Sequence, residues 1–244
     1  MSRRKMTRGN CVYCGREFAR SGMTKHLTAC PARQESWTKA EKSRLKSQPL
    51  YHLQIKDAYR GDYWLHLEMN GSATLDNLDD YLRTIWLECC GHLSAFEIEG
   101  LRYTDTRGGG FSFDEDREMK KATAAQVFHV GDTCDYEYDF GTTTELKIIV
   151  QGVREGKPTT KHPIALMSRN IAPEMMCEEK GCDQPATRIC IYCMCETDNE
   201  GELCSKHGRA HDRKHGDSYG PTMGIYNSPR TGFCGYEGPA KPPY

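Results

Sequence analysis

The chain has 244 residues, 37% of them hydrophobic, with 13 cysteines and a formal net charge of −1. This length allows one ordinary core with small satellites, or two domains, and no apolar run is long enough to span a bilayer. Residues 1–5 are basic and no apolar stretch follows them, so we expect a cytoplasmic protein whose cysteines are reduced and largely metal-bound.

Four metal-type ligands stand close together near the start of the chain: Cys11, Cys14, His26 and Cys30. The last two are four residues apart, so a helix would present them on one face. The segment resembles the two-Cys, two-His zinc-finger family, with Cys30 in place of the last histidine and one residue fewer in the central spacer. The resemblance covers residues 11–30 and implies a small ββα fold around one zinc ion.

Residues 1–50 hold twelve Lys and Arg against three Asp and Glu, whereas residues 51–160 hold eleven against twenty. This asymmetry is typical of a basic interaction arm on an acidic body, although the two segments could simply attract one another. Seven cations of residues 1–32 could meet phosphates: Arg3, Arg4, Lys5, Arg8, Arg16, Arg20 and Lys25. Many such fingers bind protein instead, so DNA, RNA and protein all stay open. Residues 33–50 favour a basic linker over a short helix.

Residues 51–158 have the pattern of an α+β domain. Strands are expected over 51–56, 63–69, around Phe96 and Ile98, and over 136–140 and 146–150, the last two pairing with each other. Between the second and third, Thr74 can cap an amphipathic helix that stops before Gly91. Its apolar residues recur at helical spacing: Leu75, Leu78, Leu82, Ile85 and Trp86. In the late strand the two-residue period places Tyr138 and Phe140 inside, with Asp139 at a turn or exposed.

This order, with Gly91-His92-Leu93 before a strand and Tyr138-Asp139-Phe140-Gly141 near the end, resembles the plasmid Ri A-type ORF family. The family is also described as transposon-passenger, TnpR-like proteins, and the resemblance covers roughly residues 50–155. It implies a fold and a link to mobile elements rather than an activity. The chain departs after Gly141, where members continue with an acidic residue, Trp and His.

The central segment offers little that is typical of catalysis. A serine recombinase needs a nucleophilic serine among arginines, and the sequence contains no such arrangement. Two acidic sets could bind a divalent cation, but solvated faces are the favoured interpretation: Asp76, Asp79 and Asp80, and Asp135, Glu137 and Asp139. Cys89-Cys90-Gly91-His92 lacks the spacing that favours thiol exchange, so burial at a helix end is favoured over a redox or metal role.

Eight more ligands follow in four close pairs: Cys177 with Cys182, Cys190 with Cys193, Cys204 with His207, and His211 with His215. Four thiolates or imidazoles close one tetrahedral zinc site, so two ions are predicted. In a cross-braced arrangement the first and third pairs share one ion and the second and fourth the other; a sequential split is the alternative. Cys195 could replace a weaker ligand, and Cys234 is too isolated in sequence to assign.

The segment 177–216 resembles cross-brace zinc families such as the B-box and AN-type fingers, which implies protein interaction without catalysis. A linker over 159–176 precedes it and a Gly- and Pro-rich segment over 217–244 follows it. In total we predict three zinc ions, no other cofactor and no membrane contact. The predicted function is a non-enzymatic adaptor or regulator that binds protein, nucleic acid or both. The alternative is an enzyme of unknown reaction with its site in the acidic central domain.

Overall fold

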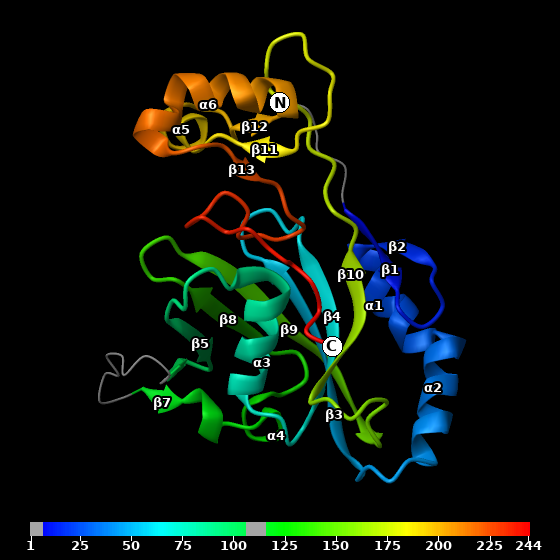
Figure 1. Ribbon diagram of the computed structural model, residues 1–244. Coiled ribbons are helices and arrows are strands. Elements are labelled where there is room, and N and C mark those ends of the chain that lie inside the picture. Colours follow the sequence, from blue (N-terminus) through cyan, green and yellow to red (C-terminus); the bar gives the residue numbers. More distant parts are fainter. Residues whose placement is uncertain (1–6, 106–115) are drawn as a thin grey trace.

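The computed structural model describes residues 7–105 and 116–244, and one twisted sheet dominates it (Figure 1). Ten strands of the described residues form this sheet, with antiparallel neighbours except where β6 and β7 run parallel. Their spatial order is β2 (Glu17–Ala19), β1 (Arg8–Cys11), β10 (Ile164–Asn170), β4 (Trp64–Asn70), β3 (Gln48–Asp57), β9 (Thr144–Gly156), β8 (Thr133–Tyr138), β5 (Ser94–Ile98), β6 (Leu101–Thr104) and β7 (Arg117–Glu118).

Helices pack around this sheet and form the second layer of the fold. Figure 1 shows α1 and α2 along one edge, α3 over one face, and α5 and α6 in a separate unit beyond the strand ends. The helices are α1 (Arg20–Ala29), α2 (Pro31–Glu41), α3 (Leu75–Leu82), η1 (Arg83–Leu87), η2 (Met119–Lys121), α4 (Ala124–Val127), α5 (Ile191–Glu196) and α6 (Ser205–Tyr219). The central domain is therefore α+β, as predicted.

The helix predicted after Thr74 is present, and its start follows from a capping box. The Thr74 hydroxyl accepts a hydrogen bond from the Asn77 amide at 3.3 Å, and the Asn77 side chain accepts one from the Thr74 amide at 3.1 Å. The helix continues as the π-helical turn η1 and ends at Leu87. The predicted apolar face lies fully in the core: Leu75, Leu78, Leu82, Ile85 and Trp86.

Two segments expected to be linkers belong to the folded body. Within 33–50 the helical alternative is the one that forms, because Pro31 starts α2 at its first position and Arg33 is buried against Glu68 of β4. Within 159–176 the strand β10 lies between β1 and β4. A linker would leave β4 as the edge of the sheet, whereas β10 satisfies its backbone hydrogen-bonding groups.

The expectation that Phe140 points inward is wrong. The strand β8 ends at Tyr138, and Asp139 takes a left-handed conformation with φ of 65°, so the alternation of faces stops there. Phe140 is 46% exposed and lies under the Arg102 guanidinium, 4.9 Å from its ring centroid. Tyr138 is buried as expected, and Asp139 caps the turn by accepting from the Gly141 amide and the Thr142 hydroxyl.

Beyond the large sheet, the chain forms a small unit and then returns to the body. We call residues 177–224 the C-terminal module; it contains α5, α6 and a three-stranded sheet of β12 (Glu202–Leu203), β11 (Arg188–Ile189) and β13 (Met223–Gly224). We call residues 225–244 the tail, which has neither helix nor strand. Its Ser228 donates to the Trp86 carbonyl at 2.6 Å, and its Arg230 is fully buried. None of the helices within the described ranges is both long and apolar enough for a transmembrane span.

Candidate metal centres

The first candidate centre lies in the finger, which we define as residues 8–30. Its ligand atoms come from the end of β1, the turn after it, α1 and the residue after α1, and all four lie within 4.8 Å of one another: Cys11, Cys14, His26 and Cys30. A tetrahedral zinc site places sulfur atoms roughly 3.8 Å apart, and sulfur and nitrogen roughly 3.6 Å apart. The observed distances are 4.0 Å between the sulfurs of Cys11 and Cys30, and 3.3 Å from Cys14 to Nε2 of His26. These residues could hold a metal ion.

The finger has the predicted ββα arrangement, and its interior is continuous with the body. Met23 and Leu27 of α1 pack with Trp64 of β4 and Met167 of β10 in one buried cluster. Burial raises the pKa of the Cys11 thiol to about 11, so a neighbouring cation would be needed to hold it as a thiolate at neutral pH.

The second candidate centre joins two ligand pairs of the C-terminal module: Cys177, Cys182, Cys204 and His207. The Cys177 sulfur lies 3.2 Å from Nδ1 of His207, and the Cys182 and Cys204 sulfurs are 4.0 Å apart. The first and third pairs thus meet, which is the cross-braced arrangement rather than the sequential one. All four positions of a tetrahedral ion would be filled by the protein.

The third candidate centre brings together three of the four ligands expected there: Cys190, Cys193 and His211. The Cys193 sulfur lies 3.3 Å from Nδ1 of His211, whose Nε2 is 2.8 Å from the Glu179 carboxylate. A carboxylate behind a ligating imidazole fixes the orientation of its ring. His215 is not part of this group; its ring stacks on Tyr192 with centroids 3.9 Å apart and lies 5.4 Å, centroid to centroid, from that of His211. Cys195 is exposed and lies outside the group.

A fourth group was not predicted, and we call it the tail cluster: Cys89, Cys90, His92 and Cys234. The interpretation of Cys89 to His92 as a buried helix end is wrong, because Cys90 is exposed and His92 faces Cys234. The clustering of three ligands within four residues was visible in the sequence. The fourth ligand comes from the tail, 142 residues beyond His92, and no local pattern indicates it.

Of the seven cations expected to meet phosphates, the structure describes four, and three of these have partners within the protein. Arg8 pairs with Glu17, Arg16 lies 5.2 Å from the Phe18 ring centroid, and Arg20 donates to the Gly61 carbonyl at 2.6 Å. Lys25 is exposed on α1. The remaining three are outside the described residues: Arg3, Arg4 and Lys5.

The acidic residues of the central domain have structural partners. Asp79 is fully buried, which corrects the expectation of a solvated face for this residue. It accepts hydrogen bonds from Arg83 at 2.7 Å, Ser94 at 2.6 Å and Tyr136 at 2.7 Å. On β8, Asp135 pairs with Lys147, and Glu137 lies 3.7 Å from Arg102. Each of these three carboxylates therefore links its own element to another one.

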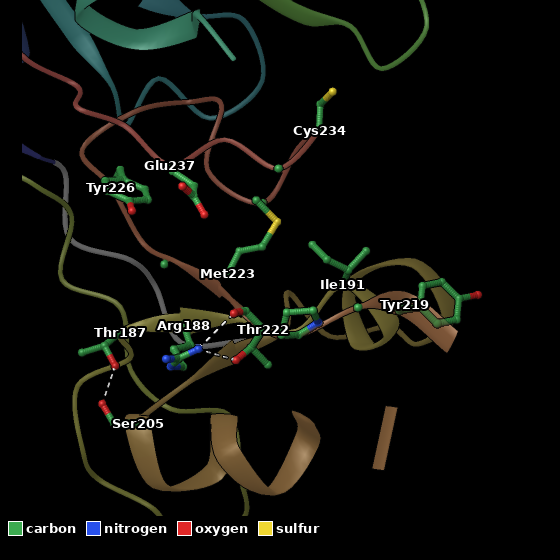
Figure 2. Close-up of a pocket in the computed structure, with 15 residues that line it drawn as sticks. Thr187, Arg188, Ile191, Ser205, Tyr219, Thr222, Met223, Tyr226, Cys234 and Glu237 are labelled. Atoms are coloured by element: carbon green, nitrogen blue, oxygen red, sulfur yellow. Dashed lines mark hydrogen bonds between the residues drawn. The ribbon is translucent and has the colours of Figure 1, made fainter. Parts of the chain in front are cut away.

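A cavity of about 830 Å³ lies between the C-terminal module and the tail. Figure 2 shows Arg188 at its floor, donating to the carbonyl and the hydroxyl of Thr222, while Tyr226, Glu237 and Cys234 of the tail line the opposite wall. The guanidinium is thus already engaged by the protein. The ionisable side chains among the lining residues are Arg188, Glu237, Cys234 and the two tyrosines Tyr219 and Tyr226.

Comparisons with known proteins identify the central domain. The family described as plasmid pRiA4b ORF-3-like protein matches residues 51–184, more than half of the chain. The match therefore extends past residue 158 and takes in β10. A crystal structure of a protein of unknown function from Methanosarcina mazei Go1 is similar over 72% of this chain and 94% of that one, with 16% identity and a TM-score of 0.40. No curated protein matches the chain.

Proposed function

We propose that this chain, which belongs to the plasmid pRiA4b ORF-3-like protein family, is a zinc-stabilised, non-enzymatic binding protein whose partner is a nucleic acid. One observation carries the non-enzymatic part. In the finger and in the second centre four protein ligands converge and leave no position for a reacting water; at the third centre, where three ligands converge, we infer that His215 completes the set, since its ring centroid lies 5.4 Å from that of His211.

The chemistry of the ligands favours zinc. The finger offers three thiols and one imidazole, and so does the second centre. Thiolate and imidazole are the ligands of structural Zn²⁺ sites, whereas Mg²⁺ and Ca²⁺ take oxygen ligands. Because ligation energy is folding energy in modules this small, the ions would act by holding surfaces in shape rather than by reacting.

Exposed cations on α6 support an anionic partner. Lys206, Arg209 and Arg213 are all exposed. Their spacing of three and four residues places them along one face of a helix. Positive side chains in a row along a helix attract a phosphate backbone through charge and release of counterions. The basic segment of residues 1–50 adds to the same attraction.

The test measures binding of the full chain to a fluorescent DNA duplex and to a single-stranded RNA at 20 to 200 mM salt. Binding should weaken by about 0.9 log units per contacted phosphate for each log unit of salt on the duplex. The triple variant Lys206→Gln, Arg209→Gln, Arg213→Gln should lose about three phosphate contacts and so flatten the salt dependence by the corresponding amount. The charge-matched control replaces three exposed lysines of the body: Lys120, Lys121 and Lys161.

If the salt dependence flattens equally in the triple variant and in the control, net charge alone explains the binding and α6 is not a specific contact surface. Absence of binding to either nucleic acid at the lowest salt, where screening is weakest, would overturn the nucleic-acid partner and leave a protein partner as the alternative.

A further inference from the structure

The tail cluster joins two parts of the chain that lie far apart in the sequence. Cys89, Cys90 and His92 belong to the connection between η1 and β5, and Cys234 belongs to the tail. The four ligand atoms lie within 4.8 Å of one another. Nε2 of His92 is 3.0 Å from the Cys90 sulfur and 3.1 Å from the Cys234 sulfur. The Cys90 sulfur is 3.6 Å from that of Cys234 and 3.9 Å from that of Cys89.

We propose that the tail cluster is a fourth zinc site, with three thiolates and one imidazole as ligands, and that its ion clamps the tail onto the body. The sulfur–sulfur distances are close to the roughly 3.8 Å edge of a tetrahedral zinc site. The sulfur–nitrogen distances are about half an ångström shorter than the corresponding roughly 3.6 Å edge, so the set is compact enough to surround one ion.

The surroundings of His92 are those of a metal ligand. Its Nδ1 lies 3.4 Å from a carboxylate oxygen of Asp139, while its Nε2 faces the thiols. With the proton on Nδ1 directed to Asp139, Nε2 keeps its lone pair for the ion, which is the arrangement that carboxylates impose on zinc-bound histidines. Asp139 is itself fixed, because it accepts a hydrogen bond from the Thr142 hydroxyl at 2.7 Å and pairs with Arg230.

An independent set of contacts places Cys234 at this position. Arg230, four residues earlier, is fully buried; it pairs with Asp139 and donates to the Thr144 hydroxyl at 3.1 Å. Ser228 donates to the Trp86 carbonyl one turn before Cys89. The tail is therefore anchored immediately before Cys234 by hydrogen bonds to oxygen atoms, and Arg230 in addition lies 3.8 Å from the Cys89 sulfur. Those contacts deliver the fourth ligand to three that are already together.

The site also differs from the finger in access. Cys90 and Cys234 are exposed, whereas Cys11 and Cys30 are each 1% exposed. A chelator reaches an exposed ion without prior opening of the fold, so the ion of the tail cluster should leave first. Its loss should release the tail while the sheet stays intact.

The experiment counts zinc in the full chain, purified reduced and without chelator, by elemental analysis. Cys90→Ser and Cys234→Ser should each lower the count by one ion per chain relative to the parent. Cys195→Ser is the matched control, since Cys195 is exposed, lies outside every candidate group and should leave the count unchanged. With Co²⁺ in place of zinc, each of the two ligand variants should lose the same share of the sulfur-to-cobalt charge-transfer band.

Limited proteolysis separates the clamp from a general loss of fold. In both variants, cleavage within residues 225–244 should become at least several-fold faster, while cleavage of the sheet stays at the parental rate. Equal zinc counts in the parent, Cys90→Ser and Cys234→Ser would overturn the proposal. So would a Cys90–Cys234 disulfide found by mass spectrometry in the parent protein in place of the ion. None of these readouts depends on nucleic-acid binding, so the outcome is independent of the function proposed above.

Discussion

The finger and the C-terminal module carry the same kind of ligand but depend on the rest of the molecule to different degrees. In the finger, Cys11 and Cys30 share a buried cluster with Trp64 and Met167 of the body. Its strand β1 pairs with β10, which extends the main sheet. In the C-terminal module the buried cluster consists of four cysteines and Leu203, and the strands are two residues long.

The two regions thus differ in how much of their buried core consists of candidate metal ligands. A module whose core is made of its own candidate ligands has little apolar area to bury, so bound ions would have to supply most of its stability. The finger buries apolar side chains against the sheet in addition to its ligands. An ion bound in the finger would therefore add to packing that persists in part without metal.

The largest expected effect is the loss of the second centre. Cys204→Ser removes a ligand from a module in which apparent zinc-binding energies of about 10–16 kcal/mol are folding energy. Hydrogen exchange across residues 177–224 should accelerate to the rate of an unstructured chain. The equivalent Cys14→Ser in the finger should accelerate exchange in α1 but leave protection in β1. Equal loss of protection at both ends would contradict the contrast between them.

The next effect concerns the core that the finger shares with the body. Trp64→Ala should cost about 3–5 kcal/mol of unfolding free energy, as a large core truncation. Trp86→Ala is the matched control, because Trp86 is equally buried but belongs to the separate cluster under α3. Both variants should lose similar stability in urea denaturation, but only Trp64→Ala should speed release of zinc from the finger to a chromogenic chelator. Equal release rates would mean that the shared cluster does not support the finger.

A smaller effect is expected from the ion pairs that fix α2 to the sheet. Glu68 is 3% exposed in its side chain and accepts from Arg33 at 3.0 Å and from Arg154 at 2.7 Å. Glu68→Gln leaves these cations without a counter-charge and should cost about 3 kcal/mol. The exposed Lys39–Glu35 pair on the same helix provides the control, and Glu35→Gln should change the unfolding free energy far less, because solvent screens an exposed pair. A cost below that of the control would contradict the structural role of Glu68.

The last effect is a pH dependence from the buried pair of His52 and His66, whose ring nitrogens are 2.8 Å apart. Burial first, and then the charge of Arg33, lowers the pKa of His52 from 6.5 to about 3. Between about pH 3 and pH 6.5 the histidine binds more protons in the unfolded chain than in the folded one. The free energy of unfolding therefore falls as the pH is lowered below 6.5. The loss is at most about 1.4 kcal/mol per pH unit for each histidine.

Replacing this pair isolates its share of the pH dependence. Urea denaturation from pH 7 to 5 should show a flatter slope for His52→Gln than for the parent, whereas His129→Gln, at an exposed histidine, should keep the parental slope. Any contribution of the candidate metal centres is the same in all three proteins, so the difference between slopes reports His52. A parental slope in His52→Gln would rule out this origin.

What could be predicted from the sequence follows from the range of each interaction. The ligands of the finger stand at spacings set by one turn and one helix, and the cap at Thr74 requires only Asn77 three residues later. In contrast, no local pattern indicates β10, because its place in the sheet depends on two strands more than ninety residues away. Cys234 was missed for the same reason.

Burial of charge was the second limit. Asp79 could be assigned to a solvated face because its neighbours in sequence are acidic, yet it is fully buried. One local indication of this burial is Arg83, four residues after Asp79, because the two side chains lie on the same helix face and form an ion pair at 2.7 Å. The buried partners Ser94 and Tyr136 belong to strands β5 and β8, and only the folded sheet brings them to the Asp79 carboxylate on α3.

The pairing of β1 with β10 has a consequence for the order of events during synthesis. The Ser168 hydroxyl donates to the Asn10 carbonyl across 158 residues of chain. At about 5–20 residues per second, a ribosome makes that stretch in roughly 8–30 s. The finger thus emerges with its strand edge unpaired, long before the partner strand exists. An ion bound early would keep the hairpin and α1 folded during that interval, so that β10 pairs with a strand β1 that is already formed.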